Sequence, residues 1–115
     1  MISPAINFII LVALRLARFE FPSDAKINDR ISVVCSTLSG SPPSQFEWLK
    51  NGLQLQKDER VRTMNDEYSS TFTIVHLRRE DAANYTCIVK SKNEMDAFTS
   101  TLAIKGEIRI FKPQL

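Results

Sequence analysis

The sequence is poor in the residues on which catalytic and phosphate-binding sites depend. Its 115 residues contain one histidine, His76, and only three glycines. They form neither a Gly-x-Ser-x-Gly nucleophile turn nor a glycine-rich phosphate-binding loop. The 15 Lys and Arg residues stand against 13 Asp and Glu residues, without the strong excess that is typical of nucleic-acid-binding proteins. We therefore expect no enzymatic activity, no cofactor or metal, and neither nucleic acid nor a small-molecule substrate as a partner.

Long apolar runs are also scarce. The run from Ile6 to Leu14 is too short to span a bilayer, and it looks like the hydrophobic region of a secretory signal that is cleaved after Ala17. A plain apolar extension is the alternative, because no positive charge precedes the run and Arg15 lies close to the expected cut. We expect residues 1–17 to be a signal peptide. The chain should be extracellular, secreted or at the cell surface, and should reach a membrane only through further parts of a longer protein.

Cysteine is limited to Cys35 and Cys87, which lie too far apart for the CxxC spacing of zinc sites and redox motifs. One long-range disulfide is the favoured interpretation. In the loop-entropy model it stabilises the fold by roughly 4 kcal/mol. Such a bond persists in oxidising compartments, which agrees with secretion.

Alternating patterns predict β-strands along most of the chain. The segment Arg30–Thr37 alternates with the period of two that is typical of a half-buried strand, and this places Cys35 on the inward face. Turn residues at Ser39–Ser44 end the strand, and Asn51-Gly52 predicts a hairpin. Further strands are expected at 45–50, 70–77, 84–90 and 98–105. Short strands at this spacing predict an all-β sandwich or barrel.

Four residues give this predicted fold a family resemblance. Cys35, a tryptophan at Trp48, and Tyr85 two positions before Cys87 fill the arrangement of an immunoglobulin domain. The segment between the predicted hairpin and the strand that begins at residue 70 is too short for the two extra strands of a variable-type domain. Residues 18–105 therefore resemble the intermediate, or I-set, type. The resemblance implies an immunoglobulin-like β-sandwich of two antiparallel sheets joined by one disulfide.

The resemblance also implies roles for core residues. Trp48 would pack against the disulfide, the Tyr85 hydroxyl would return to the main chain, and Leu77 would fill the corner below it. Asp81 would lie at the same turn and pair with an arginine.

Two arginines are candidates for this pair with Asp81, and we prefer Arg60 to Arg62. Asn84 points away from the core and begins an Asn-Tyr-Thr sequon, so it is the expected glycosylation site.

A narrower resemblance rests on four segments, which are FEFP (Phe19–Pro22), NDRISVVCS, GSPPSQFEWLKNG and NYTC. Together they resemble the immunoglobulin domains of the Down syndrome cell adhesion molecule (Dscam) family, particularly the variable domains of arthropod members. The resemblance implies a cell-surface recognition domain that pairs, through one sheet face and in antiparallel fashion, with an identical copy on an opposing cell. Asp96 stands where the family's hairpin usually has Gly. Residues 106–115 do not resemble a linker to a second domain, and we interpret them as a truncated or read-through tail.

The strand parities indicate a candidate binding face. Small and β-branched side chains point outward on one predicted sheet, and such a flat surface suits a modest, specific protein contact. The expected face consists of Ser32, Val34, Arg62, Met64, Thr71, Thr73 and Val75, with Ser36 beside them. An ordinary solvent-exposed surface is the alternative.

Three functions from different classes remain open. The first is homophilic cell adhesion and recognition of the Dscam type, with an identical domain as the protein partner. The second is a secreted immune recognition or decoy module that binds a heterologous ligand. The third is a structural unit of an elastic intracellular protein, which the signal-like segment, the sequon and the expected disulfide disfavour.

Overall fold

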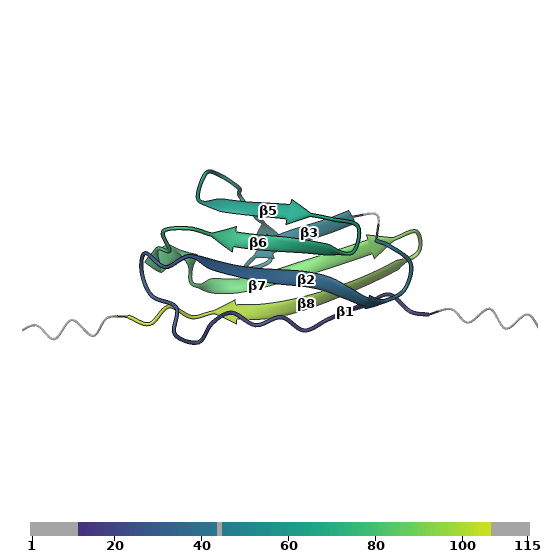
Figure 1. Ribbon diagram of the computed structural model, residues 1–115, viewed down its shortest axis with the longest axis horizontal. Helices are drawn as coiled ribbons and strands as arrows, with labels where there is room; N and C mark the ends of the chain where they lie inside the picture. Colours follow the sequence, from purple (N-terminus) through teal and green to yellow (C-terminus); the bar gives the residue numbers. More distant parts are fainter. Residues whose placement is uncertain (1–11, 44, 107–115) are drawn as a thin grey trace, which may run out of the picture.

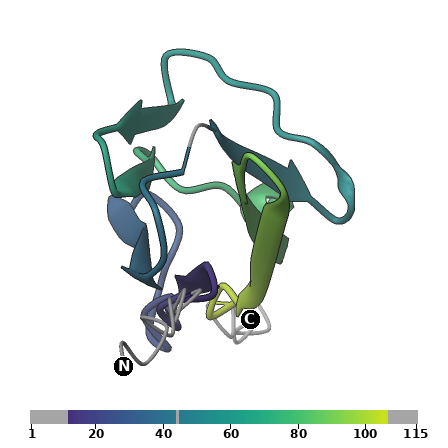
Figure 2. The same ribbon diagram turned by 90° about the vertical axis from the view of Figure 1, so that its right-hand side faces the viewer.

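The computed structural model describes residues 12–43 and 45–106 and folds them into two four-stranded antiparallel sheets. One sheet has the strand order β1-β2-β6-β5 and the other the order β4-β3-β7-β8. The strands run along the long axis in Figure 1, and Figure 2 shows the two sheets as opposite walls of a sandwich. The elements are β1 (Arg15–Leu16), β2 (Ile31–Ser39), β3 (Gln45–Lys50), β4 (Leu53–Gln54), β5 (Val61–Asn65), β6 (Ser69–Ile74), the 3-10 helix η1 (Arg79–Asp81), β7 (Ala83–Ser91) and β8 (Glu94–Leu102). The all-β sandwich predicted from the sequence is confirmed.

Alternation of side chains builds the interior of this sandwich. Every second side chain is buried from Ile31 to Cys35 in β2 and from Ser70 to Ile74 in β6. Tyr85, Cys87 and Val89 are the buried positions of β7. Because successive side chains of a strand point to opposite faces, the alternation in the sequence determines which residues enter the core.

The Asn51-Gly52 turn joins β3 to β4 as predicted. Both residues have positive φ, 49° at Asn51 and 80° at Gly52, which is the combination that a type I′ hairpin turn requires. Lys50 and Leu53 face each other across the hairpin. In the part of the chain that the structure describes, β4 adds one two-residue strand to the edge of the β3-β7-β8 sheet, and β5 of the other sheet follows it directly. A second extra strand, as in a variable-type domain, is absent there.

The segment before β2 contributes aromatic residues to the core. Phe19 and Phe21 are only 5% and 9% exposed. Their ring centroids lie 5.5 Å from those of Trp48 and Tyr85, respectively. Phe72 of β6 lies between these partners, with its ring centroid 5.1 Å from Trp48 and 4.9 Å from Tyr85. Such aromatic contacts add to the stabilisation that burial alone provides. The FEFP segment is therefore part of the sandwich interior.

Part of the expected signal peptide also lies within the fold. Leu14 and Leu16 are buried among the core residues, and β1 pairs with β2 through Arg15 opposite Ser39 and Leu16 opposite Thr37. Cleavage after Ala17 remains a prediction, and it would remove this strand. Residues 1–11 of the expected leader and 107–115 of the expected tail lie outside the described residues. Within 12–43 and 45–106, no helix is long and apolar enough to cross a membrane.

Candidate recognition surface and its supporting core

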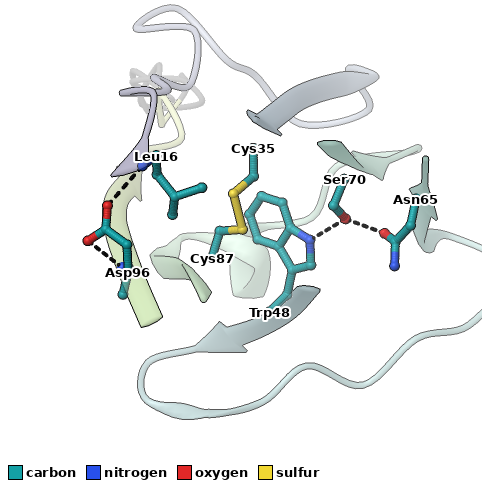
Figure 3. Close-up of a disulfide and its surroundings, with 8 residues drawn as sticks. Leu16, Cys35, Trp48, Asn65, Ser70, Cys87 and Asp96 are labelled. Atoms are coloured by element: carbon teal, nitrogen blue, oxygen red, sulfur yellow. Dashed lines mark hydrogen bonds between the residues drawn. A yellow bond between two sulfur atoms is a disulfide. The ribbon is translucent and has the colours of Figure 1, made fainter. Parts of the chain in front are cut away.

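The disulfide joins the two sheets at their centre. Cys35 of β2 and Cys87 of β7 are bonded, with their Cα atoms 6.4 Å apart, and both are completely buried. Trp48 lies opposite Cys87 in the β3–β7 pair, and Figure 3 shows its indole beside the bridge. The prediction of one long-range disulfide is confirmed. The bond ties the two sheets together covalently.

A hydrogen-bonded chain that the sequence did not indicate continues from this tryptophan. The indole Nε1 of Trp48 donates to Ser70 Oγ at 2.8 Å, and the Ser70 hydroxyl donates to Asn65 Oδ1 (Figure 3). Ser70 is completely buried, so its hydroxyl gives the buried indole N–H the partner that such a donor needs. The only sequence signal was a serine at an inward-facing position of an apolar strand.

Asp81 organises the corner between η1 and β7. Its carboxylate receives two hydrogen bonds from Arg60, at 2.7 Å and 3.0 Å, and one from the main-chain N–H of Arg78, at 2.7 Å. The hydroxyl of Tyr85 donates to the carbonyl oxygen of Asp81 at 2.6 Å, and Leu77 is completely buried at the same corner. Arg60 is thus the arginine that pairs with Asp81.

Burial and hydrogen bonds shift the pKa values of this corner in opposite directions. Burial alone would raise the pKa of Asp81, but the hydrogen bonds from Arg60 and from the Arg78 N–H outweigh it and hold the pKa below its usual range. Burial, aided by the nearby Asp81 charge, raises the pKa of Tyr85. Asp81 is therefore ionised and Tyr85 neutral at physiological pH.

The seven residues of the expected binding face lie together on the outer side of the β1-β2-β6-β5 sheet. Strand pairing aligns Ser32, Thr73 and Arg62 in one row across the sheet and Val34, Thr71 and Met64 in the next, with Val75 directly after β6. Among the apolar members, Met64 is 78% exposed and Val34 is 47% exposed. The Ser32 and Thr73 hydroxyls hydrogen-bond at 2.9 Å. We call this surface the outer β2–β6–β5 face.

A shallow hollow of about 390 Å³ lies on this face. Six of the seven expected residues line it, all except Val34, and Arg30 and Thr63 complete its wall. Arg30 and Arg62 are the charged residues of this lining, so the hollow is basic. The opposite end of β5 and β6 carries Asp66 and Glu67 in the connecting turn. Hydrogen bonds from the hydroxyl of Ser69 and from main-chain N–H groups lower the pKa of Asp66, so this end is acidic.

Asn84 is exposed on the outer side of the other sheet. Its Oδ1 accepts a hydrogen bond from Thr101 Oγ1 at 2.6 Å, and Thr86, the third residue of the sequon, shares a hydroxyl hydrogen bond of 2.7 Å with Thr99. The sequon therefore lies on the face opposite to the outer β2–β6–β5 face.

Across 12–43 and 45–106, no three His, Cys, Asp or Glu side chains converge in a way that could hold a metal ion. His76 is exposed after β6 with a positive φ of 52°, and its carbonyl oxygen accepts a hydrogen bond from Arg60 at 3.3 Å. In this position the backbone of His76 turns the chain away from β6.

Known proteins that are similar to this chain in sequence or structure include cell adhesion molecules and titin. Cell adhesion molecule Dscam2 of Drosophila melanogaster is 30% identical over 97 residues, which are 84% of this chain and 5% of that protein. Titin of Drosophila melanogaster is 38% identical over 68 residues, or 59% of this chain. Among solved structures, the Dscam1 Ig7 domain (isoform 5) has a TM-score of 0.75 at 20% identity and covers 83% of this chain and 99% of that domain.

Dscam2 and titin are much longer than this chain, which spans 5% or less of each of these two proteins. Some relatives are named as kinases, such as smooth-muscle myosin light chain kinase of Gallus gallus. The part that this chain matches in them is the sandwich domain. The sequence matches the immunoglobulin I-set domain over residues 18–104. The chain therefore belongs to the immunoglobulin I-set family.

Proposed function

We propose that this domain is an extracellular recognition and adhesion module of the Dscam type, which pairs with an identical copy through the outer β2–β6–β5 face. The observation that carries the proposal is this face itself, a surface of small and β-branched side chains with exposed Val34 and Met64 and a shallow hollow. The relatives of this chain that are named cell adhesion molecules support the same role. The buried disulfide supports an oxidising, extracellular location.

The charge distribution of the face supports pairing with an identical copy. A two-fold interface brings the same patch of both copies together, so the patch must complement itself. In an antiparallel arrangement the basic hollow of one copy, with Arg30 and Arg62, faces the acidic turn of the other copy, with Asp66 and Glu67. A parallel arrangement would place like charges against each other, which is unfavourable.

The sequon supports the choice of this face. A glycan on Asn84 covers the outer side of the β4-β3-β7-β8 sheet, because Asn84 and Thr86 point outward there. The opposite sheet stays free to bind a protein. The full-length protein would supply the membrane attachment and further domains.

The first test measures self-association of the secreted chain by sedimentation velocity over a concentration series. Val34→Arg and Thr73→Arg are each expected to weaken the dimer by roughly tenfold or more, because the two-fold axis brings the new charges close together. Thr99→Arg, an exposed substitution on the opposite sheet, is the matched control and should leave the dimer unchanged.

A charge exchange tests the antiparallel arrangement in the same experiment. Arg30→Glu should weaken the dimer, and adding Glu67→Arg to it should restore association. A chain that stays monomeric at the highest concentration would overturn homophilic pairing. The alternative, a secreted immune recognition module that binds a heterologous ligand, would then be favoured.

A second test concerns the glycan. Chain produced in secreting animal cells is expected to lose mass on enzymatic removal of N-glycans, and Thr86→Ala should abolish this loss because the sequon is gone. Thr99→Ala removes the same hydroxyl hydrogen bond but keeps the sequon, so its mass should still fall. An unchanged mass for the parent chain would contradict glycosylation at Asn84.

A further inference from the structure

We infer that the segment Ala13–Ala17, which contains β1, is a permanent part of the mature domain, so that any proteolytic removal of a leader occurs before Ala13 and not after Ala17. Such processing is independent of the proposed recognition function. Packing, hydrogen bonds and a glycine that leaves room for the segment support its retention.

The side chains of this segment complete the core. Leu14 and Leu16 are 5% and 7% exposed and belong to the same cluster of buried residues as the disulfide. Figure 3 shows Leu16 directed toward the Cys35–Cys87 bridge. A chain that begins at Arg18 would leave the space of both leucines open to water, which is costly for the apolar surface around them.

Hydrogen bonds hold the segment from two sides. The main-chain N–H of Leu16 donates to Asp96 Oδ2 of β8 at 2.8 Å (Figure 3). On the other side, the N–H of Ala17 donates to the Ser36 carbonyl at 2.8 Å, and the Ser39 hydroxyl donates to the Ala13 carbonyl at 2.7 Å. The segment thus bridges the edges of the two sheets. Asp96, which departs from the usual glycine of the related hairpin, supplies the bond to the second sheet.

Gly40 leaves room for the backbone of this segment. Its φ is 99°, and a Cβ atom at this position would lie only 2.7 Å from the Cα atom and 3.0 Å from the nitrogen of Leu14. Gly52 also has a positive φ, of 80°, but a Cβ atom there would meet no atom within 4 Å. The turn at Gly52 requires glycine for its dihedral angles alone, whereas Gly40 is also required by the close approach of β1.

Retention of the segment also protects the sheet that carries the outer β2–β6–β5 face. β1 pairs with the end of β2 at Thr37 and Ser39. Without it, this part of β2 becomes an open edge, and open edges pair with other chains unselectively. A retained β1 therefore directs contacts to the face of the sheet.

The direct test is to express the full chain from Met1 in secreting cells and to determine the N-terminus of the folded product by sequencing and intact mass. We expect Ala13–Ala17 to be present, whether the product begins at Met1 or at any residue up to Ala13. A product that begins after Ala13, such as one that begins at Arg18, would overturn the inference. The readout does not depend on self-association.

A double-mutant cycle in the full chain tests the close approach independently. Gly40→Ala should displace β1, so Leu16→Ala should shift the urea midpoint less in the Gly40→Ala background than in the parent chain. The control pairs Leu16→Ala with Gly52→Ala, which should be additive. The cost of a positive φ cancels within each cycle. Additive shifts for Gly40→Ala and Leu16→Ala would contradict a docked β1.

Discussion

Replacing Cys35 and Cys87 together by alanine is expected to lower the free energy of unfolding by about 4 kcal/mol. The two cysteines are 52 positions apart. In the loop-entropy model, closing a loop of this length lowers the conformational entropy of the unfolded chain and so destabilises the unfolded state by about this free energy. Because small domains are stabilised by only about 5–15 kcal/mol, this is a large share of the total. Urea unfolding followed by the fluorescence of Trp48, the single tryptophan, measures the change.

The matched control is the parent chain with its disulfide reduced, which should lose a similar free energy because it lacks the same cross-link. Thr99→Ala, on the exposed side of β8, should shift the urea midpoint little. If the double alanine variant and the oxidised parent unfold at the same urea concentration, the disulfide does not stabilise the fold as expected.

Asp81→Ala is expected to lower the free energy of unfolding by about 3–5 kcal/mol, the range for removing one partner of a buried ion pair. The substitution leaves the Arg60 guanidinium, whose side chain is only 13% exposed, without its carboxylate, and it leaves the Arg78 N–H without this acceptor. Glu47→Ala is the control, because the Lys90–Glu47 pair is 3.6 Å long with both side chains about a third or more exposed. Exposed pairs contribute about 0–1 kcal/mol.

The variant Arg60→Ala/Asp81→Ala should cost less than the sum of its two single substitutions, because it leaves no unpaired charge. Equal urea midpoints for Asp81→Ala and Glu47→Ala would contradict the assignment of Asp81 to a buried, stabilising pair.

The same pair makes stability depend on pH. The pKa of Asp81 is lower in the folded state than its ordinary value of 3.8, so its contribution is complete above that value and is lost as the pH falls through the folded-state pKa. The difference in urea midpoint between the parent chain and Asp81→Ala should therefore shrink as the pH falls below about 4. A difference that stays constant down to pH 2 would show that the Asp81 charge is not responsible.

Local patterns in the sequence predicted the strands of the sandwich and the direction of their side chains. The pairing of Asp81 with an arginine followed instead from the immunoglobulin resemblance, and the structure gives the reason why the partner is Arg60 and not Arg62. Val61 is buried at the start of β5, so Arg62 must point to the outer side, whereas Arg60 precedes the strand and turns toward Asp81. Once the start of β5 is known, the alternation of side chains along the strand therefore determines which arginine can reach Asp81.

Contacts between distant segments could not be predicted in this way. Trp48 and Ser70 are bonded across the two sheets, and Leu16 and Asp96 are 80 positions apart in the chain. Such contacts depend on how the two sheets are stacked, and alternation within one strand carries no information on stacking. The N-terminal strand was missed for a related reason, because its apolar run matches both a signal peptide and a buried segment.

The covalent bridge between the sheets also determines how the domain responds to mechanical tension. When the chain is pulled from both sides, the load passes through the bond between Cys35 and Cys87, and the stretch of 52 positions between them cannot lengthen. An extended chain spans about 3.4 Å per residue, so the bond withholds roughly 180 Å of length. Only the segments before Cys35 and after Cys87 extend under load. Under tension, a protein that contains this domain would therefore lengthen less than one whose sandwich lacks the bridge.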